Sequence, residues 1–212
     1  FVTGKIAISK YFFTINKKSK WITNKYSRGR VHLLRSKHDC LLTSSSTVIK
    51  DDPQLTCRIK GLEYTSPSKI ILDKNLRTPV KSKIIKSAKD SNTIIFFNKS
   101  SAKKINLLKS LGIRLYKVPV DLSQNFILLD VLKKIHTLGF SRVFLEAGAK
   151  LTEVFLKNSL VDDFYLFISD KILDNNGKNT FKKNMRFLMS NKKVINTKVN
   201  LLGDNMIFYR LK

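Results

Sequence analysis

A run of five hydroxyl side chains at residues 43–47 is the part of this sequence best suited to binding chemistry. The run follows the short apolar stretch 40–42, which predicts the end of a buried strand, and precedes the turn Asp51-Asp52-Pro53. Ligands of open α/β folds bind where such strands end. Hydroxyl groups at that edge can donate hydrogen bonds to phosphate oxygens. Taken alone, the same residues also fit a polar loop closed by an Asp-Pro turn.

A second candidate site lies at residues 145–151, LEAGAKL, which predict a strand, a tight turn and a helix. Gly148 would let the backbone approach a ligand, and the free N–H groups at the helix start attract phosphate. Glu146 ends the strand as either a satisfied core group or a substrate contact. Because a lone glycine is also common in ordinary strand–helix turns, this segment is ambiguous by itself. The sequence contains no G-x-G-x-x-G motif, which argues against a Rossmann site.

The elements that must position these residues follow from the periodicity of apolar side chains. Strands are predicted over 1–9, 39–43, 69–73, 93–97, 113–118, 142–145, 163–169 and 206–211. Helices are predicted over 24–37, 101–111, 128–138 and 149–158, the first capped by Thr23. Residues 174–200 are predicted as a loop with a weak helix near 181–187. This alternation predicts an α/β domain with a largely parallel sheet and an antiparallel edge formed by the last two strands.

Composition bounds the class of protein. A chain of 212 residues with 42% apolar side chains is typical of one globular domain. No apolar run is long enough to span a membrane, so we expect no membrane partner. Two cysteines are too few for a disulfide framework, which favours a reduced, cytoplasmic protein. The three histidines are not grouped with cysteine at metal-binding spacing, and we expect no metal. The first residue is Phe, so we expect a piece of a longer chain or a trimmed one.

The net charge of +26 has three interpretations. It fits a nucleic-acid-binding protein, attraction of an anionic substrate and a phosphorylated cofactor, or compositional drift toward residues with AT-rich codons. The lysines are scattered along the chain and form no dense tract. We therefore favour drift, with attraction of anions as a by-product, and expect no nucleic-acid partner.

The ordered set of these segments resembles the reductase domain of the riboflavin-biosynthesis family. The resemblance rests on SKWIT at 19–23, Arg35, TSSSTVIKDDPQLTCR at 43–58 and LEAGAKL at 145–151, and it extends over residues 5–171. It implies a three-layer α/β/α fold, dihydrofolate-reductase-like, whose mixed sheet ends in an antiparallel C-terminal hairpin. It also implies NADPH-dependent reduction of the ribosyl group of 5-amino-6-(5-phosphoribosylamino)uracil to the ribityl compound. In many organisms a zinc deaminase domain precedes this reductase, and no deaminase motif occurs here. We therefore expect a single reductase domain over 1–212.

The resemblance assigns roles to individual residues. Lys5 and Glu146 take the catalytic positions, with Lys5 the better candidate to assist proton delivery. The positions that match substrate contacts are Ser19, Arg35, Leu55, Arg58 and Glu146. The positions that match cofactor contacts are Ala7, Trp21, Thr47, Asp51, Lys74, Gly148, Ala149, Lys150, Leu151, Thr152, Glu153 and Val154. Lys74 stands where the family often has a small hydroxyl residue, and its charge suits a phosphate. A homodimer or higher homo-oligomer is the expected assembly.

The largest departure from the family lies at Tyr11-Phe12, where its members usually carry Asp-Gly. Glycine permits backbone conformations that phenylalanine rarely adopts, so this loop is expected to differ. Two alternatives remain. A dihydrofolate reductase would share the fold but fits the hydroxyl run and the arginine pair less well. A basic nucleic-acid-binding protein would group its cations on one face, interleaved with aromatic residues.

Overall fold

The computed structural model describes residues 1–189, 193–195 and 199–212. The chain forms two compact units, one made of Phe1–Leu34 and Phe144–Lys212 and the other of Arg35–Val143. Strands and helices alternate along the chain, and most pairs of neighbouring strands are parallel. The predicted α/β class with a largely parallel sheet is therefore confirmed.

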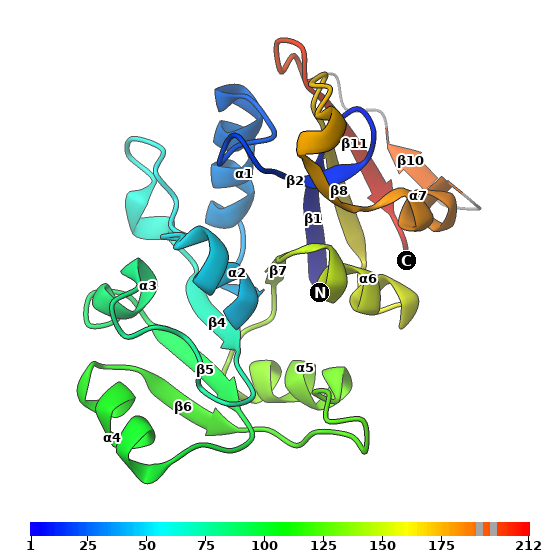
Figure 1. Ribbon diagram of the computed structural model, residues 1–212. Coiled ribbons are helices and arrows are strands. Elements are labelled where there is room, and N and C mark those ends of the chain that lie inside the picture. Colours follow the sequence, from blue (N-terminus) through cyan, green and yellow to red (C-terminus); the bar gives the residue numbers. More distant parts are fainter. Residues whose placement is uncertain (190–192, 196–198) are drawn as a thin grey trace. The chain divides into compact units, whose positions relative to one another are not determined.

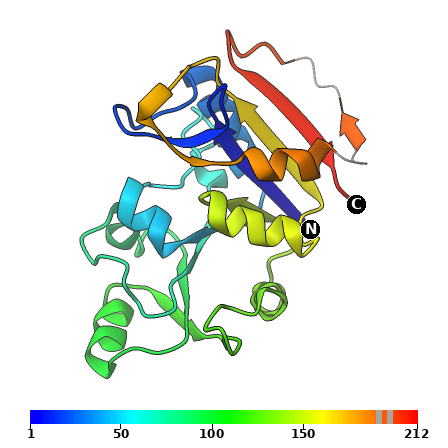
Figure 2. The ribbon, with the colours of Figure 1, turned by 45° about the vertical axis from the view of Figure 1, so that its right-hand side comes forward.

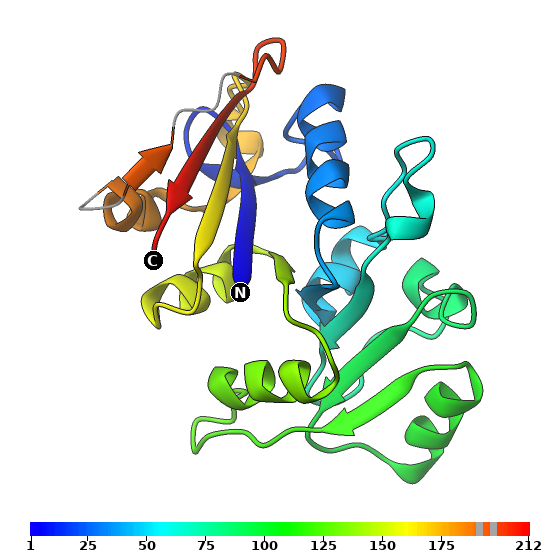
Figure 3. The same cartoon turned by 180° about the vertical axis from the view of Figure 1, so that it is seen from behind.

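The first unit contains a sheet in the order β10-β11-β8-β1-β7 and a separate ribbon of β2 and β9. Its strands are β1 (Val2–Ile8), β2 (Phe13–Asn16), β7 (Val143–Glu146, from the boundary), β8 (Asp163–Ile168), β9 (Gly177–Thr180), β10 (Lys193–Ile195) and β11 (Asn205–Arg210). Its helices are α1 (Lys25–Ser36, which ends in the second unit), α6 (Ala149–Lys157) and α7 (Lys182–Met189). Strands β1 and β8 are parallel, whereas β11 runs antiparallel to both β8 and β10 (Figure 3). The predicted antiparallel pairing of the last two predicted strands, β8 and β11, is confirmed, and the edge of the sheet is formed by β10, which was not predicted.

The second unit contains a sheet in the order β3-β4-β5-β6, and all three strand pairs are parallel (Figure 1). Its strands are β3 (Cys40–Ser44), β4 (Ser68–Leu72), β5 (Thr93–Phe97) and β6 (Arg114–Lys117). Its helices are α2 (Ser45–Asp51), α3 (Lys83–Lys86), α4 (Ala102–Ser110) and α5 (Leu128–Thr137). Parallel strands end at the same edge, so polar residues that follow β3 and β4 are brought together there.

The two cores follow from the apolar patterns. Strands β4 and β5 each contain a continuous apolar run, 70–72 and 94–97, as expected for strands covered on both faces, and Ile70, Ile71 and Ile94 are fully buried. Strand β1 instead alternates, with Ile6 and Ile8 buried. Figure 2 shows α6 and α7 on one face of β1 and β8. The alternation leaves Lys5 and Ala7 half-buried on the other side of the β1 pleat.

Some local predictions were wrong. Helix α1 is capped by Asn24, whose Oδ1 accepts hydrogen bonds from the N–H groups of Tyr26 and Ser27, and not by Thr23. Both residue types cap well, so sequence alone does not choose between them. The hydroxyl run does not form the polar loop that the sequence also allowed, because Thr43 and Ser44 end β3 while the next three residues begin α2.

Among the described residues, five short strands and helices were not predicted, namely β2, α2, α3, β9 and β10. The weak helix near 181–187 is present as α7, but the rest of the predicted loop 174–200 includes β9 and β10. Residues 190–192 and 196–198 of that loop lie outside the described part of the chain. None of the described helices is both long enough and apolar enough to cross a bilayer.

Candidate functional site

In the first unit, the two predicted catalytic residues are brought together across 141 positions of sequence. Lys5 lies in the middle of β1, and Glu146 is the last residue of β7. The Lys5 Nζ lies 3.7 Å from the Glu146 Oε1, and each side chain is 15% exposed. A half-buried ion pair of this kind keeps both charges fixed yet open to a ligand. The pair can hold a hydroxyl group by donating from Lys5 and accepting at Glu146.

Gly148 is the N-cap of α6, directly after the strand that ends at Glu146. Its φ of −70° is open to other residues, and no protein atom lies within 4 Å of the position that a Cβ would take. The glycine is therefore not required by packing within the protein. Open space beside the N–H groups at a helix start fits a phosphate group that approaches the backbone closely.

The other predicted cofactor residues of α6 differ in exposure. Thr152 is fully buried, and its hydroxyl donates to the Ala147 carbonyl at 3.5 Å. Glu153 lies 2.7 Å from Lys157, and this hydrogen bond holds the pKa of Glu153 below its usual value. Val154 is 43% exposed. The remaining members of this predicted segment are Ala149, Lys150 and Leu151 in the first turn of the helix.

Trp21 and Ser19 lie in the segment between β2 and α1. The Ser19 hydroxyl accepts from the Trp21 N–H at 3.2 Å, which closes a local turn. The indole is 45% exposed, with the Arg28 guanidinium 4.8 Å from its ring centre. An exposed indole with a cation over its ring can stack on a flat ligand, and the cofactor contact of Trp21 stays a prediction.

The turn after β1 keeps a glycine-like backbone although its residue is Phe12. Phe12 has a φ of 67°, in the left-handed region. Its N–H donates to the Ser9 carbonyl at 2.9 Å, and its carbonyl accepts from the Phe181 N–H at 2.7 Å. The surrounding hydrogen bonds therefore impose a conformation that costs a phenylalanine about 1 kcal/mol or more. Phe12 therefore adopts a backbone conformation that favours glycine, and the expected difference of this loop from the family stays a prediction.

In the second unit, the hydroxyl run forms the junction of β3 and α2. The Ser44 Oγ caps α2 by accepting from the Thr47 N–H at 3.4 Å, and it lies 2.8 Å from the Ser46 Oγ. The buried Thr43 Oγ1 has no hydrogen-bond partner among the described residues. Asp51 is exposed at the end of the helix. The hydroxyl residues therefore lie at the carboxyl end of β3, and their role in binding a ligand stays a prediction.

The predicted substrate residues of this unit are held by the segment after α2. Arg35 is 8% exposed and donates from Nη1 to the Thr56 carbonyl at 2.8 Å. Arg58 is exposed and donates to the Gln54 Oε1 at 2.7 Å. Leu55 is buried with a φ of 54°, so the chain turns sharply between these contacts. Gln54 was not predicted as a site residue, and its only sequence signal is its position four residues before Arg58.

Lys74 follows β4 at the same edge. Its Nζ donates to the Gln124 carbonyl at 2.8 Å. The neighbouring Asp73 is fully buried and accepts three hydrogen bonds, from the N–H groups of Arg77 and Thr78 and from the Thr78 hydroxyl. The sequence analysis did not predict the contact with Gln124, because the sequence of a polar loop does not show which backbone carbonyl will accept a hydrogen bond from a distant lysine.

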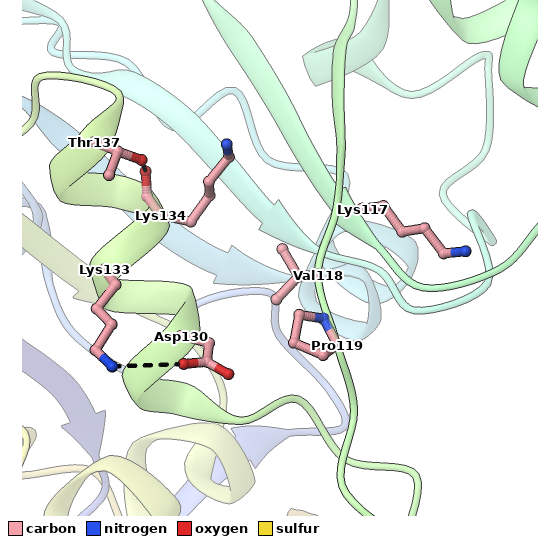
Figure 4. Close-up of a pocket in the computed structure, with 7 residues that line it drawn as sticks. All are labelled: Lys117, Val118, Pro119, Asp130, Lys133, Lys134 and Thr137. Carbon is pink, nitrogen blue, oxygen red and sulfur yellow. Dashed lines mark hydrogen bonds and ion pairs between the residues drawn. The ribbon is translucent and has the colours of Figure 1, made fainter.

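A pocket of about 310 Å³ also lies in this unit, between the segment after β6 and helix α5 (Figure 4). It is lined by Lys117, Val118, Pro119, Asp130, Lys133, Lys134 and Thr137. None of the predicted site residues is among them, and Asp130 is occupied by Lys133 at 3.9 Å. The pocket is therefore separate from the predicted chemistry.

The fold places the chain in a known class, the α/β proteins with a dihydrofolate-reductase-like fold. The fold is shared with dihydrofolate reductase from Enterococcus faecalis, solved with NADP(H), at a TM-score of 0.50, 9% identity and coverage of 99% of this chain and 95% of that one. Over residues 8–207 the sequence matches the family model described as the RibD C-terminal domain, and the chain belongs to that family.

Relatives and solved structures agree with this assignment. RibD of Aquifex aeolicus is 32% identical over 206 residues, which are 97% of this chain and 54% of that protein. A 5-amino-6-(5-phosphoribosylamino)uracil reductase of Buchnera aphidicola is 28% identical, over 77% of this chain and 81% of that protein. The structure of Acinetobacter baumannii RibD has a TM-score of 0.78 at 24% identity, covering 99% of this chain and 57% of that one. The chain spans about half the length of the RibD relatives.

Proposed function

We propose that this chain reduces the ribosyl group of 5-amino-6-(5-phosphoribosylamino)uracil to the ribityl group, with NADPH as the reductant. Family membership supports a reductase, and the Buchnera relative carries this activity in its name. The observation that supports it best within the chain is the Lys5–Glu146 contact at 3.7 Å, because it joins the two residues expected at the reacting sugar. We further propose that the two units act as a single reductase domain, in a cytoplasmic homo-oligomer.

When bound, the nicotinamide supplies a hydride to C1′ of the ring-opened ribosyl group. The protein supplies orientation and charge. Glu146 accepts a hydrogen bond from a sugar hydroxyl, and Lys5 donates to the sugar and assists delivery of the proton that accompanies the hydride. Arg35 and Arg58 hold the anionic substrate, since guanidinium groups bind phosphate in pairs of hydrogen bonds. Ser19 and Leu55 complete the substrate contacts.

The cofactor is expected to contact both the hydroxyl run at 43–47 and the segment at 145–151. Ala7 and Trp21 would hold the nicotinamide half, because one is a small residue on the open face of β1 and the other a flat exposed ring. The open backbone at Gly148 fits the pyrophosphate. Thr47, Asp51 and Lys74 would contact the rest of the cofactor. We expect NADPH to bind more tightly than NADH.

The direct test is a turnover assay with the aminouracil phosphate, following loss of reduced-nicotinamide absorbance. Oxidation of NADPH that depends on the substrate is the expected result. A folded protein that binds cofactor and substrate but yields no ribityl product would refute the proposal. Gly148→Val should abolish cofactor binding in calorimetry while leaving the protein folded, because the added side chain meets no protein atom within 4 Å at its Cβ and the poorer N-cap costs only about 1 kcal/mol.

A further inference from the structure

Lys74 carries a charge that its surroundings in the second unit do not neutralise. It follows β4 by two residues, and Leu72 at the end of β4 pairs with Ser44 at the end of β3. It therefore lies at the carboxyl edge of an all-parallel sheet, where ligands of α/β folds bind. Its side chain is half-buried, and the hydrogen bond made by its ammonium group is exposed to solvent, so a ligand can reach it.

The carboxylate nearest in sequence is already committed. Asp73 accepts from the Arg77 N–H at 2.9 Å and from the Thr78 N–H and hydroxyl, both at 2.7 Å. None of the ion pairs formed between described residues includes Lys74. Its ammonium donates instead to a neutral acceptor, the Gln124 carbonyl at 2.8 Å.

That acceptor is presented by a tight loop. Gln124 has a φ of 62°, its N–H donates to the Asp121 carbonyl at 2.9 Å, and the Asn125 N–H donates to the Asp121 Oδ1 at 2.8 Å. A bond from an ammonium to a carbonyl is weaker than one to an anion, because a charged acceptor roughly doubles the strength of such a bond. An anion at this edge would therefore displace the Gln124 carbonyl from Lys74.

We propose that Lys74 is the residue that selects a cofactor with a 2′-phosphate, by exchanging its bond to the Gln124 carbonyl for a bond to that phosphate. The inference rests on the proposed function, since that function supplies a cofactor of this class. A dinucleotide with a free 2′-hydroxyl offers only a neutral acceptor, no better than the carbonyl it would replace. Discrimination between the two cofactors follows from that difference.

The experiment compares binding of adenosine 2′,5′-bisphosphate and adenosine 5′-monophosphate by calorimetry, without nicotinamide and without turnover. The wild-type chain should bind the bisphosphate at least about tenfold more tightly. Lys74→Gln should reduce this ratio by about tenfold or more while leaving monophosphate affinity within about twofold. The control is Lys109→Gln, which removes the same charge from an exposed residue in the last turn of α4, toward the opposite edge of the sheet.

An unchanged ratio in Lys74→Gln would overturn the inference, as would an equal loss in Lys109→Gln or a wild-type protein that does not distinguish the two probes. Hydrogen exchange gives a second readout. The amide of Gln124 should exchange faster in Lys74→Gln, and in the wild type on adding the bisphosphate, because the turn loses its bond to the lysine. If the probes behave as expected but the aminouracil phosphate is not reduced, the proposed reaction fails and the role of Lys74 stands.

Discussion

At the scale of single residues, the contact between Lys5 and Glu146 can be tested most directly by mutation and kinetics. We expect Glu146→Gln to lower kcat/KM by about tenfold to a hundredfold, because a charge-assisted contact contributes on the order of 1.5–3 kcal/mol. The matched control is Asp130→Asn, which removes a carboxylate from another lysine contact, 3.9 Å long and on the surface of α5. Equal losses in steady-state kinetics of both variants would contradict the assignment of Glu146.

Lys69 is a second residue with a testable charge. It is fully buried in β4, its Nζ donates to the Ser91 hydroxyl at 2.5 Å, and burial lowers its pKa below the ordinary value. Between that lowered pKa and the unfolded value of about 10.4, the unfolded chain holds more protons. The contribution of Lys69 to the free energy of unfolding therefore rises as the pH rises through that window.

Lys69→Met should accordingly stabilise the protein at neutral pH by on the order of 1 kcal/mol. Removing the buried charge stabilises the protein more than losing the hydrogen bond to Ser91 destabilises it. The gain should shrink as pH rises toward about 10.4. The measurement is the difference between urea-unfolding free energies of the two proteins across pH. Burial raises the pKa of Cys40 to about 12 and also raises the pKa of Tyr165 and Tyr209, but these effects are common to both proteins. A gain that is independent of pH would contradict this account.

At the scale of elements, the ribbon of β2 and β9 depends on one glycine. Gly177 has an ordinary φ of −76°, but a Cβ at this position would overlap the ring of Phe13 on the paired strand. Gly177→Ala should therefore destabilise the protein by about 1–3 kcal/mol in thermal or urea unfolding. Gly29→Ala is the control, because no atom lies within 4 Å of that Cβ position in the middle of α1.

The control should raise stability by about 0.5–1 kcal/mol, the usual gain when alanine replaces glycine inside a helix. Opposite signs for the two alanine variants are the expected outcome. Destabilisation by both would mean that the overlap with the Phe13 ring is not what distinguishes the two positions. The ribbon also includes Phe13 next to the strained Phe12, so its stability bears on the turn that follows β1.

At the scale of the whole molecule, the net charge of +26 should act on every anionic ligand. We expect the affinity for NADPH to fall as salt rises from low to physiological ionic strength, because exposed charges are screened beyond about 8 Å at 0.15 M. The fall should be larger for NADPH than for NADH, since the 2′-phosphate adds negative charge. Calorimetric titrations at several NaCl concentrations give both slopes. Equal slopes would show that overall charge attracts the cofactor without regard to its phosphate.

The sequence by itself determined the elements whose pattern is local. The apolar runs of β4 and β5 and the helical repeat of α5, ended by Gly139 at a φ of 90°, were recognisable because burial and backbone handedness constrain each residue separately. The family was recognisable for a related reason. The hydroxyl run and the LEAGAKL segment are each a continuous stretch of sequence, so their residue order and spacing can be recognised without knowing any contacts.

Only the tertiary structure decided the pairings between distant segments. The Lys5–Glu146 contact, the Lys74–Gln124 bond and the β2–β9 ribbon join residues that are 50 or more positions apart or strands too short to show a pattern. It also decided that Asn24 and not Thr23 caps α1, because Asp204 and the Leu201 carbonyl hold Asn24 in place. Such choices depend on which partner folding brings within hydrogen-bond distance, and no local propensity records that.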